Sequence, residues 1–83
     1  MNVEREVVTV LEQVLNLQGR GGTFVASTPL LGSVAELDSM AVVSVLTSLE
    51  ERFGFVIDDD EIDGSTFTTV GTLSSFVARK LAG

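Results

Sequence analysis

Apolar residues recur at three- and four-residue spacing in three stretches of the chain, which is the pattern of helices with one buried face. The first stretch, residues 3–17, is expected to begin after Asn2 as N-cap and to end at Gly19. The second, residues 38–54, ends at Gly54, which suits the left-handed position after a helix. The predicted buried positions of these two helices are Val3, Val7, Val10, Leu11, Val14, Leu15, Val42, Val45, Leu46, Leu49 and Phe53.

The third stretch follows Thr68 or Thr69, either of which can cap a helix. Its apolar face comprises Val70, Leu73, Phe76, Val77 and Leu81. Before it, Phe55 and Ile57 form a short apolar bridge, and the acidic run 58–63 leads into a loop or one short helix.

A long connection, residues 18–37, separates the first two helices and holds several glycines and the only proline. Because it exceeds the usual helix–helix loop, we expect that it is either functional or held against the core by its apolar residues. The candidates are Phe24, Val25, Leu30, Leu31 and Val34. No stretch alternates with period two for long enough to form a sheet. The pattern therefore predicts one all-α domain over residues 1–83, a small four-helix bundle of three long helices and one short helix.

Composition narrows the possible functions of this domain. The formal net charge of −7 disfavours nucleic acid as a partner. The chain has no cysteine and no histidine, which excludes thiol nucleophiles, disulfides and the commonest general base and metal ligands. We accordingly expect no metal site. No apolar run approaches the roughly 20 residues of a membrane span, and we expect a monomeric, cytoplasmic protein.

The tripeptide Asp38-Ser39-Met40 lies where the long loop becomes the second helix. If the Asp38 carboxylate caps this helix, the Ser39 hydroxyl is left free on its first turn. Leu37 and Val42 then occupy the positions of a hydrophobic staple. A serine without a general base is a poor catalyst but a good attachment point, so we interpret Ser39 as the site of a prosthetic group supplied from outside.

Three segments together resemble the acyl carrier proteins: Leu37-Asp38-Ser39-Met40, residues 49–54 (LEERFG) and Thr69-Val70-Gly71. The similarity is continuous from about Leu37 to Leu81. It implies a four-helix bundle whose Ser39, flanked by Asp38 and Met40, receives 4′-phosphopantetheine from coenzyme A through a phosphopantetheinyl transferase. The thiol of that arm would carry acyl groups as thioesters, and the protein would present them to partner enzymes while catalysing nothing itself.

The same helix carries the expected docking surface for those partners. Met40 and Val43 fall on its outward side beside Ser39, unless they pack beneath the long loop. Glu50 and Glu51 stand in its last turn, where the helix dipole disfavours negative charge. The resemblance implies that acidic residues along this helix meet basic patches on acyl-transferring or acyl-modifying enzymes.

The chain departs from the carriers of general fatty acid biosynthesis at Ala41 and Ser44, where those carriers have acidic residues. Its negative charge lies instead at Glu36, Asp38, Glu50, Glu51 and residues 58–63. This difference favours a dedicated carrier in a specialised lipid, polyketide or cell-surface polymer pathway. The β-branched core is also compatible with a pocket for the acyl chain.

Other hypotheses remain open at this point. Asp59, Glu61, Asp63 and Gly64 partly match a calcium loop, but Val70 stands where the bidentate glutamate belongs. The chain could also be an unmodified helical adaptor that binds through Met40 and Val43, or an aminoacyl or peptidyl carrier. An independent enzyme is the weakest hypothesis, because only hydroxyl nucleophiles are present.

Overall fold

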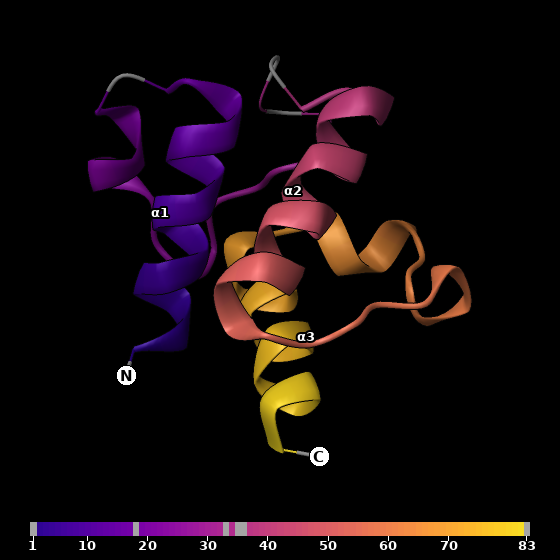
Figure 1. Ribbon diagram of the computed structural model, residues 1–83. Coiled ribbons are helices and arrows are strands. Elements are labelled where there is room, and N and C mark those ends of the chain that lie inside the picture. The colour runs from indigo at the N-terminus through magenta and orange to yellow at the C-terminus, as the bar shows by residue number, and fades with distance from the viewer. Residues whose placement is uncertain (1, 18, 33, 35–36, 83) are drawn as a thin grey trace.

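Among the residues that the structure describes, three α-helices form the body of the molecule: α1 (Val3–Leu15), α2 (Ser39–Phe53) and α3 (Val70–Ala82) (Figure 1). The computed structural model describes residues 2–17, 19–32, 34 and 37–82, without the side chains of Arg20 and Asp59. Three 3₁₀ segments complete the described chain: η1 (Arg20–Thr23), η2 (Asp59–Glu61) and η3 (Gly64–Phe67). The all-α class is confirmed, and these described residues contain no strand beyond one isolated bridge between Pro29 and Thr69.

The predicted fourth helix is replaced by the two separate segments η2 and η3. Asp63 divides them, because its extended backbone and its carboxylate begin η3 with a capping box that includes Thr66. The buried Thr66 and Phe67 then tie this single turn to the core. A count of four helices is therefore not confirmed.

Both ends of α1 are set by asparagine. The Asn2 side chain accepts the Arg5 N–H at 3.0 Å, as predicted. The predicted end at Gly19 is wrong, because Asn16 takes the left-handed conformation at φ 55° and the N–H of Leu17 donates to the Glu12 carbonyl. Asparagine tolerates this conformation, and the buried Leu17 supplies the apolar contact of a Schellman ending.

The core lies where α1 packs against both α2 and α3 (Figure 1). Seven of its fully covered side chains come from the predicted apolar faces: Val7, Leu11, Val45, Leu49, Val70, Leu73 and Val77. Leu17 and Leu30, which follow α1 and lie in the long connection, are covered as completely. Val42, Leu46 and Phe53 are partly buried against this cluster. Leu81, also predicted to be buried, is 39% exposed because α3 extends past the core in its last turn.

Backbone hydrogen bonds hold the long connection to the start of α3. The N–H groups of Leu30 and Leu31 donate to the carbonyls of Thr68 and Phe67. In the other direction, the N–H groups of Val70 and Gly71 donate to carbonyls of the connection. Among its apolar residues, Leu30 is buried and Phe24 and Val34 are partly buried, whereas Val25 and Leu31 are about half exposed, contrary to prediction.

Thr69 rather than Thr68 caps α3. Its hydroxyl accepts the Thr72 N–H at 3.1 Å, and the Thr72 hydroxyl accepts the Thr69 N–H at 3.0 Å. No helix among the residues described above is long and apolar enough to cross a membrane.

Gly71 provides a test of the contact between the connection and α3. Its N–H donates to the Ala26 carbonyl at 2.7 Å, and an added Cβ would lie 2.9 Å from that oxygen. Overpacking costs about 1–3 kcal/mol, which exceeds the roughly 1 kcal/mol that alanine gains over glycine in a helix. We expect Gly71→Ala to lower the free energy of unfolding by about 1 kcal/mol in urea titrations followed by circular dichroism. Gly22→Ala, where an added Cβ meets nothing within 4 Å, is the control and should change stability little; equal effects would contradict the packing argument.

Candidate functional site

Ser39 is the first residue of α2, and Asp38 is its N-cap. The Asp38 carboxylate accepts the Ala41 N–H at 2.8 Å, and the backbone of Asp38 is extended. Leu37 is buried just before the cap and Val42 is partly buried one turn later, as the predicted staple requires. The Ser39 side chain is exposed, and capping by Asp38 leaves its hydroxyl available for a covalent bond.

This position fits a phosphodiester. The first N–H groups of a helix have no intrahelical acceptor, and here Asp38 accepts only those of Ala41 and Val42. The N–H groups of Ser39 and Met40 can therefore face an anion at the positive end of the helix dipole. The Asp38 carboxylate opposes this attraction, so the covalent bond would be the main link of a phosphate to Ser39, with the helix dipole and two N–H groups supporting it.

The apolar residues beside Ser39 are open to solvent. Met40 is 77% exposed and Val43 is 59% exposed, which confirms their outward placement and excludes packing beneath the long loop. Glu51 is also exposed. A docking role for these residues stays a prediction. Glu36, named above among the positions that carry negative charge, lies outside the described residues.

Glu50 has a structural partner that the sequence did not indicate. It is half-buried, and its Oε2 accepts the N–H of Ile57 at 2.7 Å after the chain has reversed at Gly54. The neighbouring Arg52 pairs with Glu6 of α1, with Nε 2.7 Å from Oε1. Side chains in the last turn of α2 thus connect this helix to the segment that follows it and to α1.

A groove of about 280 Å³ runs along α2 on the face that carries Ser39. Val43, Leu46, Thr47 and Glu50 form one side, at helical spacing from Ser39. Ile57 and Ile62 form the other side. The contribution of Ile62 could not be foreseen, because it depends on how residues 55–63 fold back over α2.

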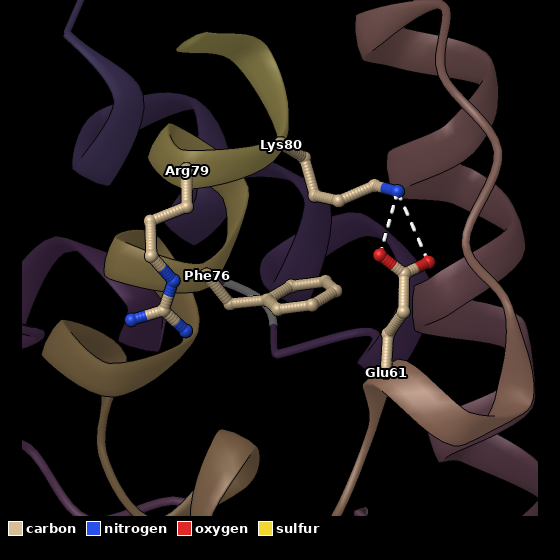
Figure 2. A pocket seen from close by; sticks show the side chains of 4 residues that line it. All are labelled: Glu61, Phe76, Arg79 and Lys80. Carbon is tan, nitrogen blue, oxygen red and sulfur yellow. Dashed lines mark hydrogen bonds and ion pairs between the residues drawn. The ribbon is translucent and has the colours of Figure 1, made fainter. Parts of the chain in front are cut away.

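A second cleft, of about 400 Å³, is lined by Glu61, Phe76, Arg79 and Lys80 (Figure 2). The Lys80 ammonium donates to both oxygens of Glu61, at 2.8 and 3.0 Å, and joins η2 to α3. Glu61 also accepts the Asp58 N–H at 2.7 Å. Both hydrogen bonds lower the pKa of Glu61 below its ordinary value, and the bond from Lys80 has the larger effect.

The acidic run does not have the geometry of a calcium loop. Asp63 accepts the Ser65 hydroxyl at 2.6 Å and the Ser65 N–H at 3.0 Å, and these bonds lower the pKa of its carboxyl. Glu61 is engaged by Lys80, and Val70 is fully buried. In the part of the chain that the structure describes, no group of three or more acidic, cysteine or histidine side chains could hold a metal ion.

Comparisons with known proteins concern the chain as a whole. The family model described as "Phosphopantetheine attachment site" matches residues 5–77. A holo acyl carrier protein from Nitrosomonas europaea, solved in solution by NMR, is 52% identical and superposes with a TM-score of 0.93 over 100% of both chains. No curated protein sequence matches the chain.

Asp38 is expected to stabilise α2 through its carboxylate. Asp38→Ala removes the acceptor of the Ala41 N–H and should lower the free energy of unfolding by about 1 kcal/mol. Asp38→Asn keeps an acceptor oxygen and should retain most of that stability. Urea unfolding at pH 7 measures both variants, and an alanine variant as stable as the asparagine variant would argue against the cap.

The Glu61–Lys80 pair is expected to make stability depend on pH. Folding lowers the pKa of Glu61, so the stabilisation is present above the ordinary glutamate pKa and is lost as the pH falls through the lowered value. Lys80→Gln should therefore be less stable than wild type near pH 7, with the difference shrinking below pH 4. Urea midpoints across this range measure the effect. Arg79→Gln, for which no ion pair is found among the described residues, should show no such convergence; a constant gap for Lys80→Gln would refute the assignment.

Proposed function

The chain belongs to the phosphopantetheine-attachment family and is an acyl carrier protein, and from this we propose that Ser39 is the residue that bears its 4′-phosphopantetheine. The observation that carries the proposal is the exposed hydroxyl on the first turn of α2, left free because Asp38 does the capping. Proteins of this family are carriers and not enzymes, and their covalently bound phosphopantetheine supplies the thiol that holds acyl groups as thioesters. In a chain without cysteine, this thiol is the sulfur nucleophile.

The residues around Ser39 present the arm without reacting. Asp38 fixes the start of α2, and Leu37 fixes the direction from which the chain enters the helix. The family resemblance further implies a place for the acyl group within the fold. The groove beside Val43 and Leu46 is our candidate for that place, because it follows Ser39 at helical spacing along α2.

Carriers of this family work with a phosphopantetheinyl transferase and with acyl-handling enzymes. We assign the docking surface for these enzymes to the exposed Met40, Val43 and Glu51 of α2. The half-buried Glu50 lies at the edge of this surface. The exposed apolar pair supplies contact area and the glutamates attract basic enzyme surfaces. Since Ala41 and Ser44 bring no charge to the start of α2, a specialised lipid, polyketide or cell-surface polymer pathway in the cytoplasm is the setting we propose.

Intact mass tests the attachment site directly. Wild-type protein incubated with coenzyme A and a promiscuous phosphopantetheinyl transferase should gain one phosphopantetheine increment. Ser39→Ala should gain none. Ser44→Ala, which removes another exposed serine of α2, should gain the same increment as wild type.

Two results would contradict this proposal. An increment on Ser39→Ala would place the arm elsewhere. No increment on the wild type, with a transferase shown to be active on another carrier, would favour an unmodified adaptor. If the arm is attached, loading with aminoacyl groups in place of acyl groups by a cognate enzyme would identify an aminoacyl or peptidyl carrier.

A further inference from the structure

The groove beside Ser39 has one helical side and one side without regular α-helix. Val43 and Thr47 follow Ser39 by one and two turns, about 6 and 12 Å along the axis of α2. The opposite side is the segment of residues 57–62, called here the wall segment, which presents Ile57 and Ile62. Its only regular structure is η2, so contacts with the helices must hold it in place.

Two polar contacts, one near each end, connect the wall segment to the helices. At one end, the Glu50 carboxylate of α2 accepts the Ile57 N–H at 2.7 Å. At the other, Lys80 of α3 pairs with Glu61 at 2.8 Å. Figure 2 draws this pair with dashed lines. Both contacts act on the position of the isoleucines, and so on the width of the groove.

We propose that these two contacts make Glu50 and Lys80 positioning residues that limit the acyl cargo to straight aliphatic chains of medium length. This inference rests on the proposed attachment at Ser39, because only a group tethered there is held beside the groove. The lining favours an aliphatic occupant, since Val43, Leu46, Ile57 and Ile62 are apolar and only Thr47 and Glu50 are polar.

The size of the groove gives the length. A cavity of about 150 Å³ holds benzene, so roughly 280 Å³ holds on the order of ten carbon atoms. Glu50 lies farthest from Ser39 among the groove residues of α2, and a longer chain would meet its charged carboxylate. Removing water from that charge is unfavourable, so the gain from burying further methylene groups stops there.

The Lys80–Glu61 contact is the one that can be altered without disturbing the core. The two side chains keep 23% and 31% of their surface exposed, and ion pairs of this kind add little to global stability. Arg79 precedes Lys80 on α3, and its side chain points away from Glu61 in Figure 2. No ion pair is found for Arg79 among the described residues. Arg79→Gln is therefore a control matched in charge and location to Lys80→Gln.

The experiment loads apo protein with acyl-phosphopantetheine from acyl-coenzyme A donors of two to sixteen carbons. Intact mass verifies each product, and thermal unfolding gives its midpoint. For wild type, the midpoint should rise by roughly 3–6 °C per buried methylene group and level off near ten carbons. In Lys80→Gln the wall segment is released at one end, so the rise should continue to chains at least two carbons longer. Arg79→Gln should level off with wild type.

A second pair of variants fills the groove instead of widening it. Thr47→Phe places a ring on an exposed position that lines the groove and should move the plateau to shorter chains. Ser44→Phe adds the same ring to an exposed position of α2 that does not line it. This control should leave the wild-type plateau unchanged.

The outcomes separate the two proposals. No mass increment on wild type would overturn attachment at Ser39, and with it the carrier site. Normal loading with a midpoint independent of chain length would overturn the groove as the acyl site while the carrier stands. Equal plateaus for Lys80→Gln and Arg79→Gln would overturn the limit set by Lys80.

Discussion

The cap of α2 by Asp38 is the interaction on which the functional surface depends. A helix that begins at a fixed residue has a fixed phase, and each later side chain points in a direction set by that start. Here the cap turns Val43 and Glu50, about one and three turns after Ser39, toward the groove and turns Val45 and Leu49 into the core. The buried Leu37 fixes the same start from the loop side. One carboxylate thus relates Ser39, the proposed attachment residue, to the surface of α2 that follows it.

Glu50 shows how a locally unfavourable residue can be explained by its tertiary partner. A carboxylate in the last turn of a helix opposes the helix dipole. The Ile57 N–H compensates, since it would otherwise need water or another acceptor at a half-buried position. The same contact holds one end of the wall segment. The sequence revealed the conflict at this position, and only the fold revealed its resolution.

Local signals predicted the helices well and the loops less well. Asn2, Asp38, Gly54 and Thr69 act within a few residues of the ends they set, so their roles could be inferred directly. Asn16 was missed because glycine is the commoner left-handed residue and Gly19 lies nearby. The exposure of Val25, Leu31 and Leu81, and the pairing of Lys80 with Glu61, depend on contacts between distant segments that periodicity does not encode.

The division between core and wall segment matters for a carrier that must take up and release its cargo. The core residues of α1 and α3 are fully buried, so displacing them would create cavities at a cost of about 2–5 kcal/mol each. Ile57 and Ile62 are half-buried and are held by polar contacts that water can replace. Movement of this segment costs little compared with opening the bundle. At the groove that we propose for the acyl chain, the fold can therefore adjust while α1, α2 and α3 keep their packing and Ser39 keeps its position.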